Sequence, residues 1–290
     1  MATLRTIRKR IVSVRNTRQI TRAMKLVAAA KLRRAQEAVV AARPFANKIA
    51  EVLGRVVCRA DVEAHPLLLR REPKRVEIFI IASDRGLCGG FNTNILRKAE
   101  AFLLEREPAG IDVTVSVAGR KPRDYFRRRN RALRKVVTDV SGGPSFDLAS
   151  EIGEEMIARY LADEVDEVYL LYGEFRSAIA QLPTVQRILP VGKIEAEETS
   201  PEEMPLQYEY EPSVREVLQH LLPRYVYMQV HHALLESAAG EQGARMTAME
   251  AATNNASDMI GRLTLIYNRA RQAAITTELV EIVSAAEAIK

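Results

Sequence analysis

The sequence has few of the residues that covalent or metal-bound frameworks require. It contains no tryptophan and only two cysteines, Cys58 and Cys88, in 290 residues, and these do not form a CxxC motif. Disulfide frameworks and thiolate metal sites need more cysteines at closer spacing. We therefore expect neither, and we expect each cysteine to be a small buried hydrophobe rather than a reactive thiol.

Long apolar runs are also missing. The sequence contains no run of about 18 uncharged apolar residues, which a helix needs to span a bilayer. Basic residues interrupt the segment from Arg5 to Arg15, so it lacks the apolar core of a secretory signal. We expect a chain that spans no membrane and that stays where it is made, or that reaches an organelle after losing a presequence.

The sequence also lacks a catalytic or metal-ligating pattern. His231 and His232 are adjacent, so on a helix they point about 100° apart and cannot share one metal. No GxSxG motif is present, and carboxylate pairs such as Glu154 and Glu155 fall on expected helix surfaces. We expect no metal, no cofactor and no catalysis by the chain itself.

Basic charge is concentrated at one end. The net charge is +6, but residues 1–60 hold 15 basic and 2 acidic residues, a net of +13. Residues 61–205 have a net charge of −4, and residues 206–290 a net charge of −3. The N-terminal segment therefore points to an acidic partner.

The first sixty residues predict one long helix. With Leu4 and Ile7 as the first a and d, sixteen heptad positions run to Val56, and thirteen of them are apolar. The three exceptions are consecutive heptad positions, Arg18, Thr21 and Lys25, which form a polar break. Pro44 lies inside this pattern, and we expect a kink there rather than a stop.

The last eighty or so residues predict a second long helix. From about Leu206 to Lys290 the apolar residues recur at heptad spacing, with a polar break at Gln242 and Arg245. At ~1.5 Å per residue this helix would be on the order of 100 Å long. Its narrow apolar seam needs cover, and the first helix can supply most of it.

The two polar breaks suggest a register for this pair. If the helices run antiparallel with their breaks level, the numbers of facing residues sum to about 265. Ala60 then faces Pro205, and Leu4 lies near Gly261. About the last 25 residues, from near Thr264, would form an overhang on the order of 40 Å. This tip is apolar enough to need a socket from another subunit.

Between the helices, strand and helix signals alternate, which predicts a mostly parallel sheet. We therefore predict an α/β fold, a small Rossmann-like domain inserted between the two helices of a long antiparallel coiled coil. The expected domains are residues 1–60, residues 61–205 with a linker at Glu195–Pro205, and residues 206–290. The expected strands are Val76–Ser83, Asp112–Val117, Lys135–Thr138 and Glu167–Tyr172, with a strand extension or hairpin at Gly173–Ala180 and Thr184–Pro190. The expected helices begin at Asn92 or Thr93, at Lys121, and at Ser145 or Asp147.

A glycine-rich loop, Ser83–Phe91, follows the first expected strand. Phosphate-binding loops occupy this position, but GxxGG matches neither GxGxxG nor GxxxxGK[ST]. We prefer a tight turn that needs positive φ. A nucleotide-binding enzyme with a coiled-coil arm remains an alternative.

Nucleic-acid binding through the basic residues 1–34 is a further alternative. However, the segment has no aromatic residue before Phe45, and its apolar residues form a seam.

Three motif regions resemble a known family. They are ITRAMKLVAAAKLRRAQ (Ile20–Gln36), SDRGLCGGFN (Ser83–Asn92), and the pair RMTAMEAATNNASDMI (Arg245–Ile260) and YNRARQAAITTELVEIVSAA (Tyr267–Ala286). Together they closely resemble the gamma subunits of F-type ATP synthases, and the similarity covers essentially the whole chain.

The resemblance implies a central rotor shaft in the F1 sector of a proton-translocating ATP synthase. Such shafts stand inside a ring of alpha and beta subunits, rest on the membrane c ring, and are held by an epsilon subunit. Their rotation changes the conformation of the catalytic beta sites, while the shaft itself is not an enzyme. The implied location is peripheral, through the c ring, on the cytoplasmic face of the bacterial inner membrane, and no nucleic-acid partner is expected.

The resemblance also implies contact residues. Those at the lever loop of the beta subunits are Met24, Lys25 and Arg245. Those at the catch loops are Arg269, Arg271, Gln272, Thr276 and Glu278. Those at the apical bearing are Val280, Ile282, Val283 and Ile289. Two departures stand out: the chain lacks the cysteine-bearing insertion of the chloroplast relatives, and Pro223 predicts a kink or break in the C-terminal helix.

Overall fold

The chain has one long helix near each of its ends, as the heptad spacing predicts. The computed structural model describes residues 3–59, 65–140, 143, 145–192 and 213–288. Helix α1 spans Leu4–Arg59 and helix α5 spans Val214–Ala288. The expected linker Glu195–Pro205 lies outside the described residues. The chain divides into two compact units: unit 1 comprises Met1–Ala28 with Met246–Lys290, and unit 2 comprises Ala29–Arg245.

Neither internal proline ends its helix. Pro44 lies inside α1 and Pro223 inside α5, and both helices are continuous through them. A proline removes one helical hydrogen bond, but packing on either side can offset that loss. Leu222 and Val226, on either side of Pro223, are fully buried. The helix break that we considered at Pro223 is therefore absent.

Within unit 1 the predicted helix register is wrong by nine or ten residues. The hydroxyl oxygens of Thr21 and Thr253 are 2.8 Å apart, and Lys25 Nζ lies 2.5 Å from Glu250 Oε1. The numbers of these facing residues sum to 274 and 275 rather than 265. The error arises because the two polar breaks do not face each other: the break in α1 faces Thr253 and Glu250.

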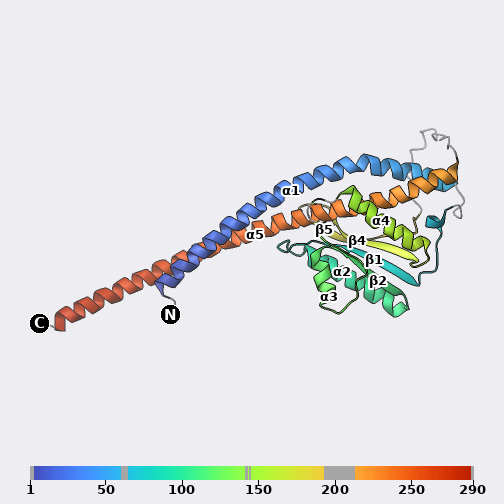
Figure 1. Cartoon of the computed structure of the whole chain (residues 1–290). Coiled ribbons are helices and arrows are strands. Elements are labelled where there is room, and N and C mark those ends of the chain that lie inside the picture. Colours follow the sequence, from blue (N-terminus) through green and yellow to red (C-terminus); the bar gives the residue numbers. More distant parts are fainter. Residues whose placement is uncertain (1–2, 60–64, 141–142, 144, 193–212, 289–290) are drawn as a thin grey trace. The chain divides into compact units, whose positions relative to one another are not determined.

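The corrected register shortens the overhang. It places Leu4 near Ala270, so the uncovered tip begins close to Arg271 instead of Thr264. The burial pattern agrees, since Tyr267, Ala270 and Ala274 are partly buried and every described side chain from Ile275 to Ala285 is exposed. Figure 1 shows the C-terminal end of α5 extending beyond the start of α1.

The middle of the chain forms a five-stranded sheet with the order β3-β2-β1-β4-β5. The strands β1 to β4 pair in parallel, and β5 is antiparallel to β4. This confirms the expected mostly parallel sheet and its edge hairpin. The strands are β1 Arg75–Ile81, β2 Asp112–Ala118, β3 Val136–Val137, β4 Glu167–Phe175 and β5 Gln181–Leu189. The helices between them are α2 Phe91–Arg106, α3 Arg120–Arg127 and α4 Phe146–Leu161, with short 3-10 turns at Pro66–Leu68 and Glu107–Ala109.

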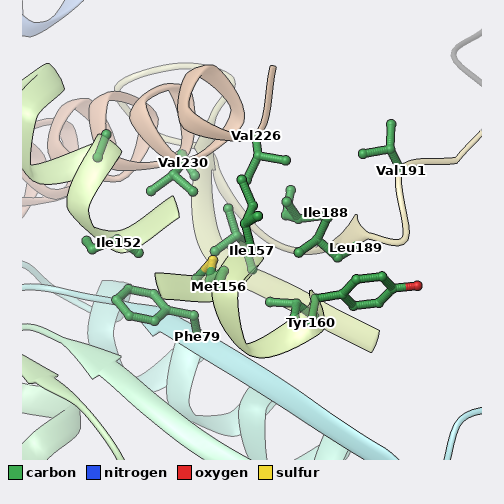
Figure 2. Close-up of a cluster of buried hydrophobic side chains, with 14 of the residues drawn as sticks. Phe79, Ile152, Met156, Ile157, Tyr160, Ile188, Leu189, Val191, Val226 and Val230 are labelled. Carbon is green, nitrogen blue, oxygen red and sulfur yellow. The ribbon is translucent and has the colours of Figure 1, made fainter. Parts of the chain in front are cut away.

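Helices cover both faces of this sheet. Because strand side chains alternate, Ile78 and Ile80 of β1 join a core with α2 and α3, whereas Phe79 and Ile81 join a core with α4 and α5. In Figure 1, α4 lies between α5 and the sheet. Figure 2 shows Met156 and Ile157 of α4 between Val226 and Val230 of α5 and Phe79 of β1. The part of α5 that belongs to unit 2 therefore contributes to the core of the α/β domain.

A buried carboxylate ties the central strands to α4. Glu77 on β1 is fully buried and accepts hydrogen bonds from Ser116 Oγ at 2.5 Å and Arg134 Nε at 2.8 Å. It is also hydrogen-bonded to Arg159 of α4. A buried charge must be paired in this way to avoid a large desolvation cost.

One helix start was predicted correctly and one was not. Ser145 caps α4 as expected, and its side chain accepts a hydrogen bond from Leu148 N. Helix α2 begins at Phe91 with Gly90 as its N-cap, so the predicted caps Asn92 and Thr93 are wrong. The reason is tertiary: Asn92 Oδ1 instead accepts hydrogen bonds from the amide and hydroxyl of Ser83.

We predict that Gly119→Ala destabilises the fold by about 3 kcal/mol, because a left-handed conformation penalty of about 1–2 kcal/mol adds to an overlap cost. Gly119 has φ +111°, and a Cβ there would lie 2.3 Å from Ala82 O. Gly110 is the matched control, since it has φ +80° with nothing within 4 Å of its Cβ position. Gly110→Ala should cost only about 1 kcal/mol in urea-unfolding free energy. Equal costs at both glycines would contradict the predicted overlap.

Candidate functional site

The carboxyl ends of β1 and β4 mark the switch point of the sheet. The chain leaves β1 towards β2 on one side, whereas β4 lies on the other side of β1. In doubly wound sheets, ligands bind in the crevice at this point. It is therefore the first place to look for a binding site in unit 2.

In this chain the crevice is filled by α5. Its two glycines in unit 2 approach the ends of the strands closely. A Cβ at Gly240 would lie 3.1 Å from the Phe91 ring and 3.3 Å from Gly173 O. A Cβ at Gly243 would lie 3.1 Å from the Phe175 ring and 3.3 Å from Ala178 Cα. The helix occupies the position that a ligand would take.

Polar side chains of α5 bond to the same strand ends. Glu236 Oε2 accepts a 2.8 Å hydrogen bond from Phe175 N at the end of β4. Ser237 Oγ donates to Ile81 O at the end of β1, at 3.5 Å. Arg245 Nη2 donates to Gly86 O at 3.2 Å and pairs with Glu241 Oε1 at 2.7 Å. We name Glu236 to Arg245, with these partners, the α5 crevice.

The glycine-rich loop is a turn, as preferred from the sequence. Leu87 and Gly89 have φ of 64° and 54°, so the loop needs the positive φ that was expected. Cys88 is buried beneath it, and Asn92 Nδ2 donates to its sulfur at 3.1 Å. Burial raises the pKa of the Cys88 thiol, which keeps it protonated at neutral pH and unreactive. The expectation of a buried hydrophobe is confirmed for Cys88, while the side chain of Cys58 lies outside the described residues.

Unit 1 carries a polar hollow, which we name the shaft groove. Its volume is about 340 Å³. The cations Arg18, Arg22 and Lys25 of α1 line one side, opposite the single acid Glu250 of α5. The remaining lining residues are Thr253, Asn254 and Ser257. The polar break in α1 therefore forms one wall of a cationic groove.

The lever-loop residues occupy different surroundings. Met24 and Lys25 belong to unit 1, where both are partly buried and Lys25 pairs with Glu250. Arg245 belongs to unit 2, where it is buried and its guanidinium bonds to Gly86 and Glu241. Arg245 interrupts the apolar seam, and its side chain instead bonds to the loop after β1.

The remaining predicted contacts lie on the exposed end of α5. The five catch-loop residues are all exposed, and the hydroxyl of Thr276 donates to Gln272 O of its own helix. At the tip, Val280, Ile282 and Val283 are 58%, 65% and 56% exposed. Ile289 lies outside the described residues. This arrangement leaves both groups accessible to other chains.

Sequence reasoning missed most of the α5 crevice and part of the shaft groove. Gly240 and Gly243 gave a usable signal, because glycine is disfavoured inside helices and two lie three residues apart. Glu236 and Ser237 gave none, since polar residues on a long helix are ordinary. Arg22 and Glu250 could have been found only with the correct register.

The residues that the structure describes lack two kinds of feature, a metal-ligand cluster and a membrane-spanning helix. They contain no group of three His, Cys, Asp or Glu side chains placed to hold a metal ion. No helix within them is long and apolar enough to cross a membrane.

Comparisons with known proteins agree with the motifs. A family model described as ATP synthase matches residues 3–289. An ATP synthase gamma chain from Geobacter metallireducens is 52% identical over 290 residues, with all of both chains covered. The fold is similar to one chain in a structure of the central stalk and c ring of Tetrahymena thermophila mitochondrial ATP synthase, with 26% identity, a TM-score of 0.61, and coverage of 80% of this chain and 99% of that one. It is also similar to one chain in a structure of the rotor of Euglena gracilis mitochondrial ATP synthase, with 20% identity, a TM-score of 0.65, and coverage of 94% of this chain and 98% of that one. The chain belongs to the ATP synthase gamma chain family, the central-stalk rotor subunits of F1.

Proposed function

We propose that this rotor subunit couples c-ring rotation to the beta-subunit catalytic sites through the shaft groove and the exposed end of α5. The observation that carries the proposal is the groove, where three cations face a single acid. The catalytic sites of this family lie in the beta subunits, so the chain's part is mechanical. It acts by presenting a different side of an asymmetric shaft to each beta subunit in turn.

The shaft groove suits an acidic moving element. Arg18 and Arg22 have no ion pair within the described part of the chain, whereas Lys25 is paired with Glu250. An acidic loop that enters the groove would find two uncompensated guanidinium groups, which can bind carboxylates in two-point geometry. Exposed pairs add little affinity, but they orient and steer a charged partner. We propose Met24 and Lys25 as the level of the beta lever loop.

Arg245 is the third residue that we propose for the lever-loop contact, and it lies in unit 2. Its guanidinium is already bonded to Gly86 O and Glu241. We propose that it fixes the loop Ser83–Asn92, which then takes part in the lever-loop contact. The assignment of Arg245 as a contact residue is thereby refined to a residue that positions the loop.

The uncovered end of α5 fits two further contacts. The exposed polar residues Arg269, Arg271, Gln272, Thr276 and Glu278 are available to the catch loops. The exposed apolar residues Val280, Ile282 and Val283 would turn inside an apolar sleeve of the alpha and beta ring, because an apolar surface of this kind is costly in water. Ile289 would extend the same surface.

The remaining partners follow from the family. The c ring and the epsilon subunit would contact the unit 2 domain and the lower part of α5, around Tyr208–Leu234. Peripheral association on the cytoplasmic face of the inner membrane is supported by the bacterial relatives named ATP synthase gamma chain.

Reconstitution tests the proposed function directly. The isolated chain should show no ATP hydrolysis, whereas mixing it with cognate alpha and beta subunits should yield an assembled, inhibitor-sensitive ATPase. The measurement is ATPase activity of the complex after gel filtration. A chain that does not co-elute with these subunits would refute the proposal.

Charge reversal tests the shaft groove. Arg22→Glu places a second acid in the groove and should lower ATP-driven proton pumping roughly threefold or more, because it repels an acidic lever. The matched control is Arg15→Glu, the same change on the same helix but outside the groove. The effect should shrink at high salt, where exposed charges are screened. Equal pumping by the two variants would rule out the groove as the lever contact.

The filled crevice also makes a prediction about the nucleotide-binding alternative. Equilibrium dialysis of the isolated chain should show no saturable binding of ATP, because α5 occupies the switch point. Tight binding that is lost on Gly89→Ala or Gly90→Ala would favour the alternative.

A further inference from the structure

A hollow lies between α1, α4 and α5 within unit 2 (Figure 1), and we name it the three-helix hollow. Its volume is about 530 Å³, which is in the range of small-molecule pockets. Its apolar walls are Phe45 on α1, Phe146 on α4, and Tyr227 and Met228 on α5. The hollow shares no residue with the shaft groove or with the exposed end of α5.

The aromatic rings of the hollow are accessible and held in place. Phe45 and Phe146 are 54% and 42% exposed, although both border an apolar space. The rings of Phe146 and His231 meet edge to face, with centroids 5.6 Å apart. The Tyr227 ring lies against the backbone of α4, because a Cβ at Gly153 would be only 2.5 Å from it. Accessible rings with fixed orientation are suited to stacking against another aromatic ring.

Two opposite charges line the same part of the hollow, Arg224 of α5 and Glu154 of α4. The contacts of Phe146 with His231 and of Gly153 with Tyr227 show that facing residue numbers sum to 377 and 380. The numbers of Glu154 and Arg224 sum to 378, so the two residues lie at one level.

Both charges are available to a ligand. Neither Glu154 nor Arg224 forms an ion pair within the described part of the chain, and both are exposed. Burial and the nearby Glu154 carboxylate raise the pKa of the Tyr227 hydroxyl, which agrees with a carboxylate beside the aromatic wall. The hollow therefore combines aromatic walls with one free cation and one free anion.

We propose that the three-helix hollow binds a small aromatic zwitterion, with its rings against the apolar walls, its carboxylate at Arg224 and its ammonium group at Glu154. A purely apolar ligand would leave both charges unused. A ligand with one charge would bring that charge close to the like charge of Arg224 or Glu154. Two opposite charges on the ligand match both residues, and such exposed pairs orient a ligand more than they tighten its binding.

A tryptophan dipeptide gives a direct test, because the chain itself contains no tryptophan. The probe is phenylalanyl-tryptophan, which has two aromatic rings, a free ammonium group and a free carboxylate. Titration of the probe with the full-length chain, followed by indole fluorescence anisotropy, should show saturable binding with a Kd below about 1 mM. The N-acetylated and C-amidated forms of the probe each lack one charge, and each should bind about fivefold more weakly.

Charge variants show which residue meets which group. Arg224→Gln should weaken binding of the free dipeptide about fivefold and leave binding of the C-amidated form unchanged. Glu154→Gln should do the same for the free dipeptide and leave the N-acetylated form unchanged. Arg215→Gln and Glu151→Gln are the matched controls, since they make the same changes on the same helices outside the lining of the hollow.

A filled hollow shows where the dipeptide binds. Ser150 lines the hollow, so Ser150→Leu adds apolar volume there and should weaken binding at least tenfold. The dipeptide should also raise the Tm of the unsubstituted chain, because a ligand that binds only the folded state stabilises it. It should leave the Tm of Ser150→Leu unchanged.

The outcomes keep this inference apart from the proposed function. Absence of saturable binding, or equal affinity for the three forms of the dipeptide, would overturn the proposed ligand class. Displacement of the dipeptide by the epsilon subunit would assign the hollow to that subunit and overturn the small-molecule site. These results would leave the rotor role standing, whereas failure to assemble with alpha and beta subunits would overturn the rotor role alone. If a variant does not fold, the three dipeptide forms on the unsubstituted chain still decide.

Discussion

The enclosure of α5 within the α/β domain is the constraint on which the rest of unit 2 depends. The helix fills the switch-point crevice, where two glycines let its backbone approach Gly173 and Ala178. The same helix supplies Val226 and Val230 to the core on one face of the sheet. A sheet with this strand order would otherwise present a ligand site at this point. Here the crevice holds a helix of the same chain.

Charged side chains have different surroundings in the two units. Inside unit 2 the charges are paired, as at Glu77 with its two arginines and at Arg245 with Glu241. Pairing of this kind avoids the cost of an isolated buried charge and fixes geometry. In unit 1 the cations Arg18 and Arg22 remain available in the shaft groove. We propose that the strongly basic N-terminal segment uses this charge for contact with other chains.

The long helices were predictable because their signals are local. Heptad spacing and the shortage of glycine and proline depend only on neighbouring residues, and both helices appear over nearly the expected ranges. The alternation of strands and helices likewise predicted a mostly parallel sheet. The polar break at Arg18, Thr21 and Lys25 was also visible in the sequence, and two of its residues, Arg18 and Lys25, line the shaft groove.

The sequence by itself determined the helices, the inserted sheet and the motifs that place the chain in its family. Tertiary structure alone decided the register, because a heptad seam fits its partner after any shift of seven residues and nearly as well after other shifts. The bond between Thr21 and Thr253 selects one alignment. Tertiary structure likewise assigned Asn92 to Ser83 rather than to a helix cap, and Arg245 to Gly86. Such bonds join residues far apart in sequence, and no local pattern records which partner a polar side chain will meet.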